Sequence, residues 1–348
     1  MSFSKILFVG LGGAGQRHLR VFHRLLGDSA SFFAYRQTRA TPLLRPDFTV
    51  DDKGSLEQTY GIRPFNTLDA AFAARPDLTV IATPTACHRT PMMLAVEAGS
   101  GVMVEKPWAE NLIGFPAFRG ALLSKRLPFQ ISFQRRYHPQ IARAHRAFSD
   151  GLIGRPQAAV FTAYSYVPDW HPYEDWRRLY AVRNELGGGV LLTEIHEIDL
   201  INWFFGLPEA VFCAGGNYGA QALPVEDTVS LILMYRDFSV QVNLCFMQKR
   251  PNRTFQITGT SGTIEWNAQE NKLAICGADG SKEVDVLPEL SNDSMFVDQA
   301  KHLLFNWTPE DTLGSLAAAA DSLAVVEAAK RSMASRRAEP VSGISSAD

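Results

Sequence analysis

Short apolar runs and longer amphipathic stretches alternate over the first third of the chain. Four apolar runs are bounded by turn residues, as is typical of buried strands: residues 5–9, 31–36, 77–82 and 101–105. Residues 16–26 and 91–98 instead place apolar side chains at helical spacing, and they are followed by Gly27 and Gly99. Since strands alternate with helices, the pattern predicts a parallel sheet with right-handed crossovers.

The pattern changes after about residue 150. Residues 239–244 alternate polar and apolar side chains, the period of a half-buried antiparallel strand, and residues 228–235 precede them across a predicted hairpin turn. Three further strands are expected, at residues 255–259, 263–266 and 273–276. An alanine-rich run over residues 316–330 predicts a closing helix, and the small, polar residues 336–348 predict a disordered tail.

A glycine-rich turn lies between the first predicted strand and the first predicted helix and matches Gly-x-Gly-x-x-Gly. Such glycines allow a tight turn and let backbone N–H groups approach a pyrophosphate at the helix N-terminus. The first helical turn carries no acid, which leaves the positive end of the helix dipole available to phosphate. The turn predicts a dinucleotide site at Gly10, Gly12, Gly13, Ala14 and Gly15.

These patterns predict an α/β protein of two domains, which suits a chain of 348 residues. Residues 1–125 are expected to form an N-terminal Rossmann dinucleotide-binding domain. Residues 126–335 are expected to form a C-terminal α+β domain with a mostly antiparallel sheet. The closing helix is expected to pack on the first domain.

The residues after the second predicted strand bear on the choice between NAD and NADP. An NAD site usually has an acid about twenty residues after the glycine turn, where it binds the ribose hydroxyls. This chain has Arg36 and Arg39 there instead. Two guanidinium groups suit a 2′-phosphate, so NADP is favoured over NAD; the alternative is a pair of solvated surface arginines.

Lys106 is the only lysine between Lys53 and Lys125, and it follows a predicted parallel strand. Ligands of such sheets bind beyond the carboxyl ends of the strands, so a cation here would face the nicotinamide. Its amine is suited to exchange a proton with a substrate hydroxyl. Lys106 is therefore a predicted acid/base residue, and Glu105 is expected to hold it in place.

Several motifs, taken in order, resemble the glucose–fructose oxidoreductase / inositol 2-dehydrogenase / rhizopine catabolism (Gfo/Idh/MocA) family, over roughly residues 1–330. In the first domain the resemblance rests on the glycine turn, on Ala82-Thr83-Pro84-Thr85 with His88, and on Glu105-Lys106-Pro107. Further along it rests on Gln134-Arg135-Arg136-Tyr137-His138-Pro139, on Gly187-Gly188-Gly189 with His196 and Asp199, and on Thr258-Gly259-Thr260-Ser261-Gly262.

The resemblance implies a Rossmann domain joined to an α/β domain whose large, open-faced sheet serves substrate binding and oligomerisation. It also implies hydride transfer between nicotinamide and a sugar or polyol carbon. It implies that Lys106 is the catalytic lysine and His196 the catalytic histidine. The family commonly has an aspartate about a turn before the histidine, whereas this chain has Leu192 or Thr193, so the second acid/base group stays open. The expected cofactor contacts also include Thr83, Pro84, Thr85, His88, Glu105 and Lys106.

The residues around His196 are expected to form one helix. On a helical wheel Leu192, His196 and Asp199 share a face, with Thr193 at its edge. Asp199 is then expected to orient the imidazole and to favour its protonated form; the alternative is an ion pair on the helix surface. Two acids point elsewhere on the wheel and are expected to be solvated or structural: Glu194 and Glu197.

Segment 164–177 is dense in aromatic and charged residues. Sugars offer C–H faces that stack on rings and hydroxyls that bond to acids and guanidinium groups, so we expect this segment to line the substrate site; the alternative is packing beneath the loop or at a subunit contact. It resembles family members tied to bacterial surface sugars, including nine-carbon acidic sugars, where Arg177 or Arg183 would bind a carboxylate or phosphate. The predicted substrate residues are Arg135, Tyr137, Trp170, His171, Asp175, Arg177, Thr193 and His196.

Composition narrows the partners. The formal net charge is −2, so the basic surface that nucleic acid or an anionic membrane requires is not expected. No apolar run approaches the roughly 18 residues of a membrane span. The four cysteines are isolated, which favours neither a disulfide nor a metal site and suits a cytoplasmic location.

The leading interpretation is an NAD(P)-dependent oxidoreductase that acts on a hydroxyl-bearing carbon of a sugar, sugar acid, inositol or nucleotide sugar. Two alternatives stay open: a glycosidase-like family member that uses transiently reduced bound NAD, and a non-catalytic cofactor-bound sensor. A homodimer or homotetramer is expected, because residues 228–246 offer a mildly polar strand face of the kind seen at subunit contacts.

Overall fold

The computed structural model describes residues 3–36, 41–288, 291 and 293–343. The chain divides into two compact units, and each is built from three separate segments. The first unit takes residues 1–134, 171–175 and 292–319, and the second takes residues 135–170, 176–291 and 320–348. Each unit is described by itself below.

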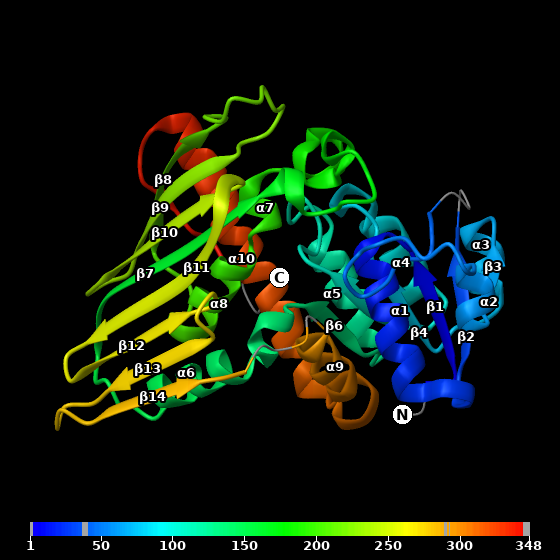
Figure 1. The fold of residues 1–348 in the computed structure, drawn as a ribbon, viewed down its shortest axis with the longest axis horizontal. Helices are drawn as coiled ribbons and strands as arrows, with labels where there is room; N and C mark the ends of the chain where they lie inside the picture. The colour runs from blue at the N-terminus through cyan, green and yellow to red at the C-terminus, as the bar shows by residue number, and fades with distance from the viewer. Residues whose placement is uncertain (1–2, 37–40, 289–290, 292, 344–348) are drawn as a thin grey trace. The chain divides into compact units, whose positions relative to one another are not determined.

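The first unit contains a six-stranded, fully parallel sheet in the order β3-β2-β1-β4-β5-β6, which is Rossmann topology (Figure 1). The predicted strands at residues 5–9 and 101–105 have these same bounds in the structure. The strands are β1 (Lys5–Val9), β2 (Ser31–Tyr35), β3 (Arg63–Phe65), β4 (Leu78–Ile81), β5 (Gly101–Glu105) and β6 (Phe129–Ser132).

The core of the first unit forms where α1 packs on the sheet. Phe22 of α1 meets Phe8 of β1 edge to face, with ring centroids 6.0 Å apart. Phe296 of α9 joins the same core, so residues far apart in sequence close this side of the sheet. The helices assigned to this unit are α1 (Gly13–Leu26), α2 (Leu56–Tyr60), α3 (Leu68–Ala73), α4 (Arg89–Glu97), α5 (Phe115–Ser124) and α9 (Ser294–Lys301).

The second unit contains a nine-stranded sheet in the order β14-β13-β12-β11-β7-β10-β9-β8-β15. Every adjacent pair is antiparallel except β7 with β10, which confirms the predicted, mostly antiparallel sheet. The strands are β7 (Pro156–Tyr166), β8 (Ala210–Gly216), β9 (Thr228–Met234), β10 (Ser239–Cys245), β11 (Met247–Gly259), β12 (Gly262–Asn267), β13 (Lys272–Cys276), β14 (Lys282–Val286) and β15 (Glu339–Pro340).

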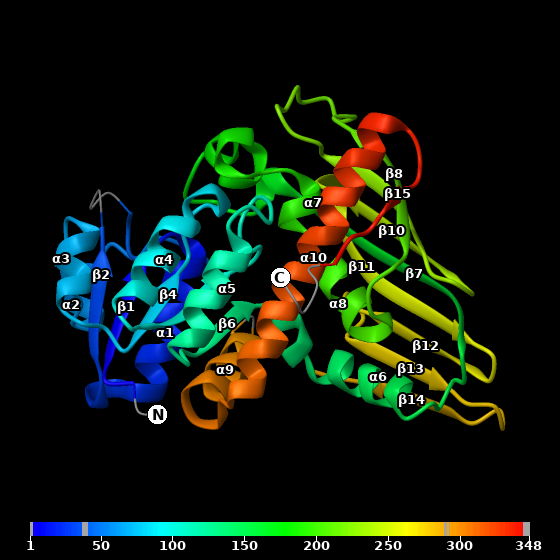
Figure 2. The same cartoon turned by 180° about the vertical axis from the view of Figure 1, so that it is seen from behind.

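Helices cover one face of this sheet, as Figure 2 shows from behind. The predicted alternation along β10 holds, because Val240, Val242 and Leu244 are fully buried while Ser239 and Gln241 are exposed. One face is therefore part of the core and the other is open. The helices of this unit are α6 (Pro139–Ser149), α7 (Val190–Thr193), α8 (His196–Phe205) and the second part of α10 (Pro309–Ser335).

Three predicted boundaries differ from the structure. The first unit runs past residue 125 because β6 pairs in parallel with β5. The closing helix starts at Pro309 rather than at 316, and its first turns belong to the first unit, where the Thr312 hydroxyl accepts the backbone N–H of Phe129 at 3.1 Å. Within the expected tail, β15 pairs with β8, so residues 339–340 are ordered by a strand contact.

Among the described residues, α10 is the one helix long and apolar enough to cross a membrane. Its most apolar window is 67% buried inside the structure, as is usual for the core helix of a globular protein.

Candidate active site

The glycine turn after β1 is shaped by close backbone contacts. Gly10 has φ +92°, and a Cβ there would lie 2.6 Å from the carbonyl oxygen of Ala82. A Cβ on Gly15 would lie 2.1 Å from the carbonyl oxygen of Gly10. Gly12 differs, because a Cβ there would meet nothing within 4 Å. The turn is thus closed on its inner side and open at Gly12, at the N-terminus of α1, so it fits a dinucleotide pyrophosphate.

An aromatic cluster that sequence reasoning did not identify lies against this turn. A Cβ on Gly13 would be 2.8 Å from the Phe48 ring and 3.2 Å from the Tyr173 hydroxyl. His171 joins them, since its ring stacks on Tyr173 at 5.2 Å and lies 5.5 Å from Phe48. Burial and the neighbouring Glu174 raise the pKa of Tyr173, and the backbone of Gly13 opposes this. Part of the predicted substrate segment therefore contacts the glycine turn.

Arg36 follows β2, as predicted, and its guanidinium is already paired. It lies 2.6 Å from Glu57 Oε1 and donates to the carbonyl oxygen of Thr41 at 3.2 Å. The side chain is buried rather than solvated, so the alternative of a free surface arginine does not hold for Arg36. Arg39, the second predicted 2′-phosphate residue, lies outside the described residues.

Lys106 follows β5 at the carboxyl edge of the parallel sheet, as expected, and is half-buried. Glu105 beside it accepts the backbone N–H of Lys106 at 3.2 Å and contacts His18 Nε2 of α1 at 2.7 Å. Burial on its own would raise the pKa of Glu105, but hydrogen bonds from His18 and Ser132 and the charge of Lys106 bring it below its usual range. A carboxylate therefore persists next to the lysine.

His88 joins the two loops that follow β4 and β5. Its ring nitrogens lie 2.8 Å from the carbonyl oxygen of Thr83 and 2.9 Å from that of Pro107. Burial lowers the pKa of His88, partly offset by these two hydrogen bonds. The predicted cofactor residues Thr83, Pro84 and Thr85 are thus fixed to the loop that carries Lys106, all within the first unit.

In the second unit the helix expected around His196 is broken. α7 ends at Thr193 and α8 starts at His196, with Glu194 and Ile195 between them, so one helical wheel does not relate Leu192 to His196. Leu192, Thr193 and His196 are all buried. The prediction of one helix around His196 was therefore wrong. No Gly or Pro lies at the break to indicate it in the sequence.

Asp199 has a different partner from the one expected. Arg136 donates to both oxygens of its carboxylate, at 3.0 Å and 2.7 Å. Burial raises the pKa of Asp199, and the Arg136 guanidinium works against this rise. A bidentate pair of this kind fixes both groups, so the carboxylate expected to orient His196 is instead bound by Arg136 of the 3-10 turn Gln134–Tyr137.

The two acids expected to be solvated or structural are buried. Glu194 is 5% exposed and Glu197 2%, and both pair with Arg253 of β11. The solvated interpretation is wrong, because each carboxylate meets a guanidinium inside the unit. Arg253 has no neighbour in sequence that indicates this role, since its partners lie 59 and 56 residues earlier in the chain.

The remaining predicted substrate residues lie in both units. Arg135 and Tyr137 lie in a short 3-10 turn, Gln134–Tyr137, and burial lowers the pKa of Arg135 to about 10. Trp170 packs edge-on against Phe246 at 5.3 Å, as expected for an aromatic beneath a loop. Arg177 is exposed with its guanidinium over the Trp176 ring. Asp175 is exposed and belongs with His171 to the first unit.

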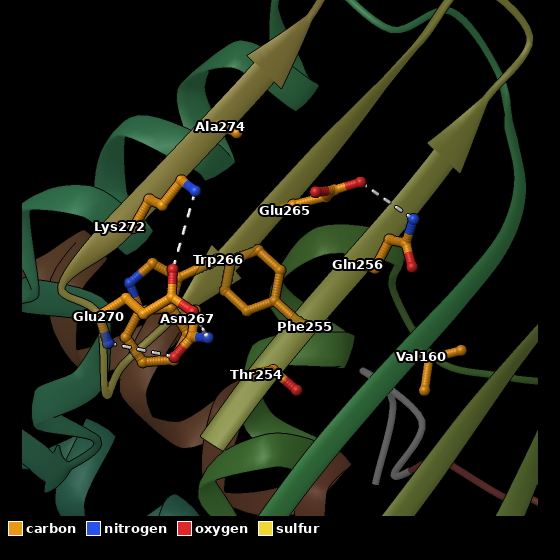
Figure 3. Close-up of a pocket in the computed structure, with 10 residues that line it drawn as sticks. All are labelled: Val160, Thr254, Phe255, Gln256, Glu265, Trp266, Asn267, Glu270, Lys272 and Ala274. Atoms are coloured by element: carbon orange, nitrogen blue, oxygen red, sulfur yellow. Dashed lines mark hydrogen bonds and ion pairs between the residues drawn. The ribbon is translucent and has the colours of Figure 1, made fainter. Parts of the chain in front are cut away.

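A separate hollow lies on strands β7, β11, β12 and β13, and Figure 3 shows its lining. Gln256 donates to Glu265 at 3.1 Å across its floor. None of the predicted site residues lines it, and it offers no imidazole or thiol. In the part of the chain that the structure describes, no group of three or more His, Cys, Asp or Glu side chains is arranged to hold a metal ion.

A Rossmann sheet with an open glycine turn defines a dinucleotide-binding α/β protein. Residues 4–115 match the family model described as "Oxidoreductase family, NAD-binding Rossmann fold", and residues 141–265 match "GFO/IDH/MocA C-terminal domain". The chain therefore belongs to the Gfo/Idh/MocA oxidoreductase family, which confirms the resemblance found in its motifs.

Named relatives add detail. The chain is 25% identical to a 2,7-anhydro-N-acetylneuraminate hydratase from Mediterraneibacter gnavus, over 68% of this chain and 62% of the relative. It is 26% identical to a D-apiose dehydrogenase from Paraburkholderia graminis, over 66% and 62%. The chain thus spans about three fifths of the length of the curated relatives that it matches.

Solved structures agree on the fold. An oxidoreductase from Agrobacterium radiobacter in complex with NAD+, L-tartaric acid and magnesium superposes with a TM-score of 0.81 at 19% identity. The match covers 98% of this chain and 99% of that one, so the whole fold is shared.

Proposed function

We propose that this protein is a nicotinamide-dependent oxidoreductase acting on a hydroxyl-bearing carbon of a carbohydrate. The observation that carries the proposal is the place of Lys106, which follows β5 at the carboxyl edge of the sheet whose β1–α1 turn forms the open glycine site. A dinucleotide bound there would supply a hydride donor or acceptor. The family, and the sugar dehydrogenase among the named relatives, support this reaction type.

Lys106 is proposed to exchange the proton of the substrate hydroxyl. The Glu105 carboxylate, held by His18 at 2.7 Å, keeps a negative charge beside the lysine and fixes the backbone that carries it. His196, in the second unit, is the proposed second proton-transfer group. Leu192 and Thr193 cannot replace the family's aspartate, since neither side chain titrates near neutral pH. Proton transfer is therefore assigned to Lys106 and His196.

The substrate is proposed to be a sugar, sugar acid, inositol or nucleotide sugar, in bacterial surface-sugar metabolism. One named relative hydrates an anhydro form of N-acetylneuraminate, an acidic sugar, and a similar solved structure holds L-tartaric acid. The side chains proposed to bind substrate remain Arg135, Tyr137, Trp170, His171, Asp175, Arg177, Thr193 and His196.

A substrate panel tests the proposal. Neutral sugars, sugar acids, inositols and nucleotide sugars are incubated with the protein and NAD+ or NADP+, and the nicotinamide absorbance is followed. The expected result is NAD(P)H formation with at least one substrate, lost in the Lys106→Met variant. Tight cofactor binding without turnover on any substrate would favour the alternative of a cofactor-bound sensor.

A second candidate, a reaction with no net redox change, is favoured by the hydratase among the named relatives. In that case the cofactor copurifies with the protein and product forms without net NAD(P)H. Chromatographic detection of product in the same panel separates this candidate from the dehydrogenase.

NADP(H) is proposed to bind more tightly than NAD(H). Arg36 lies after β2 as predicted, and within the described residues Glu57 and Thr41 engage two of its five N–H donors, which supports a guanidinium able to bind a 2′-phosphate as well. Calorimetric titration tests the preference: the Arg36→Ala variant should weaken NADP(H) binding alone. Wild-type protein that binds NAD(H) as tightly or more tightly would contradict it.

The protein is further proposed to be a homodimer or homotetramer that works in the cytoplasm. The open face of the nine-stranded sheet supports the assembly, since Ile232, Met234 and Val160 are each more than a third exposed there.

A further inference from the structure

One buried guanidinium holds the chain on both sides of His196. Arg253 projects from β11, pairs with Glu194, and approaches Glu197 Oε1 to 3.0 Å. Glu194 lies two residues before the histidine and Glu197 one residue after it. Glu194, His196 and Glu197 are each at most 5% exposed, and the Arg253 side chain is 14% exposed, so these ion pairs are largely shielded from water.

The bracketed segment is where the helix breaks. Glu194 ends α7 with φ −93° and ψ 27°, and α8 begins at His196. The second oxygen of Glu194 accepts the Ser165 hydroxyl of β7 at 3.4 Å. β7 and β11 are neighbours in the sheet, with Arg253 opposite Ala163, so the sheet contacts the break from two adjacent strands. The backbone at His196 is thereby fixed to the sheet rather than by helix hydrogen bonds alone.

Stability gives a weak reason for this arrangement. Burying two carboxylates and a guanidinium costs desolvation that their mutual attraction only roughly repays, and apolar replacements are often as stable. What such a group does supply is geometry, because a guanidinium is rigid and planar. One of its terminal nitrogens donates to Glu194, and the other lies 3.0 Å from Glu197 Oε1.

The charges of the cluster are balanced. Burial raises the pKa of Glu197, with Arg253 and Arg135 lowering it and Glu194 raising it. Burial lowers the pKa of Arg253, but Glu197 and Glu194 together leave it above its usual value. Two arginines thus lie near two glutamates, and their opposite charges partly cancel.

We propose that Arg253 is a positioning residue that fixes His196 for proton transfer by clamping Glu194 and Glu197. This inference rests on the proposed function, in which His196 transfers a proton.

Arg253→Lys is the first test, since an ammonium keeps the charge but lacks the two terminal nitrogens with which the guanidinium reaches Glu194 and Glu197 together. Arg143→Lys is its matched control, because Arg143 also bridges two acids, Glu283 at 2.6 Å and Asp285 at 3.2 Å, but between α6 and β14. On the substrate that the panel identifies, Arg253→Lys should lower kcat about 10–100-fold while KM changes less than about threefold. Arg143→Lys should leave both unchanged.

The position of the imidazole is measured independently of activity. Proteins labelled with 15N-histidine give ring signals, and the His196 signal is assigned by its loss in His196→Asn. It should shift in Arg253→Lys and not in Arg143→Lys. Glu197→Gln, which keeps size and one acceptor oxygen, serves if Arg253→Lys fails to fold, and it should shift the same signal and lower kcat.

The proposal is overturned if the folded Arg253→Lys or Glu197→Gln protein keeps wild-type kcat and an unmoved His196 signal. That result with an inactive His196→Asn would leave the proposed function intact. A fully active His196→Asn would instead contradict the role given to His196 in the proposed function.

Discussion

Burial and hydrogen bonding act in opposite directions on Glu105. Burial disfavours its charge, yet His18, Lys106 and Ser132 together leave the pKa of this carboxyl below its usual range. The carboxyl is therefore ionised throughout the neutral range, and it contacts both the first helix and the backbone of Lys106. An apolar substitution at His18 would remove the 2.7 Å contact that holds this carboxylate in place.

His138 gives a prediction for stability against pH. Burial, with the charge of Arg135 adding to it, lowers the pKa of His138 to about 4. The pKa of a histidine in the unfolded chain is about 6.5, so between that pH and pH 4 the unfolded chain binds the proton and the folded protein does not. The stability that the neutral His138 contributes is complete above about pH 6.5 and is lost as pH falls towards 4, about 3 kcal/mol in total.

Urea unfolding of the wild type and of His138→Asn between pH 7 and pH 4.5 measures this. The free energy of unfolding should fall less steeply with acid in the variant. Equal slopes for the two proteins would contradict the burial of a neutral imidazole at this position.

Single residues divide into those that local sequence identifies and those that it does not. The places of Gly10, Gly15 and Lys106 were predicted, because they follow directly from the ends of strands. The partners of Asp199 and Glu197 are not, because Arg136 and Arg253 lie 63 and 56 residues away in the chain. Ion pairs between distant segments leave no periodicity that a wheel can detect.

At the scale of elements, two glycines of the β1–α1 turn are predicted to serve different purposes. Gly15 allows the backbone to pack closely, and Gly12 leaves room for the cofactor. Gly15→Ala should destabilise the protein, because its Cβ would lie 2.1 Å from the carbonyl oxygen of Gly10. Gly12→Ala should leave the melting temperature nearly unchanged, since its φ is −71° and its Cβ would meet nothing within 4 Å.

Dinucleotide affinity should nevertheless fall about tenfold or more in Gly12→Ala, because the methyl group would occupy the side on which the pyrophosphate approaches. Thermal unfolding and fluorescence titration with NAD(P)H measure the two effects separately. Unchanged affinity in Gly12→Ala would show that the cofactor does not bind over this turn.

Elements were predictable where their own residues show a clear hydrophobic pattern, and were missed where they depend on contacts with distant residues. The β9–β10 hairpin has clean alternation and was predicted, whereas the charged edge strand β14, Lys282–Val286, has an exposed pattern on both faces and was not. The break between α7 and α8 was missed because it depends on tertiary contacts. Glu226 Oε1 accepts the backbone N–H of Leu191 at 3.2 Å, and Arg253 holds the acids around the break.

At the scale of the whole molecule, each unit draws on distant parts of the chain. Residues 292–319 return to the first unit, where Gln299 contacts Ser132 at 3.2 Å. The predicted single boundary near residue 125 missed this return of the chain, because periodicity indicates the type of an element and not the sheet on which it packs. The fold class was predictable, and the division of the chain between the two units was not.

The open sheet face yields a prediction for assembly. Ile232 and Gln241 are direct cross-strand partners on β9 and β10, so Ile232→Glu with Gln241→Arg places a matched pair of charges on this face without straining the monomer. The pair should disrupt an interface formed by residues 228–246. Light scattering at micromolar concentration should show at least a dimer for the wild type and the 38.5 kDa monomer for the double variant.

A wild type that is itself monomeric, or an assembly that survives both substitutions, would contradict this interface.

The central claim is that Lys106 transfers the substrate proton beside a dinucleotide bound at the glycine turn. The most direct measurement compares turnover and NAD(P)H affinity in wild type, Lys106→Met and a control, Lys5→Met, which changes an exposed lysine at the amino end of β1. Lys106→Met should bind cofactor normally while turnover falls about 10²–10⁴-fold, and Lys5→Met should match the wild type. Near-normal turnover in Lys106→Met would contradict the account.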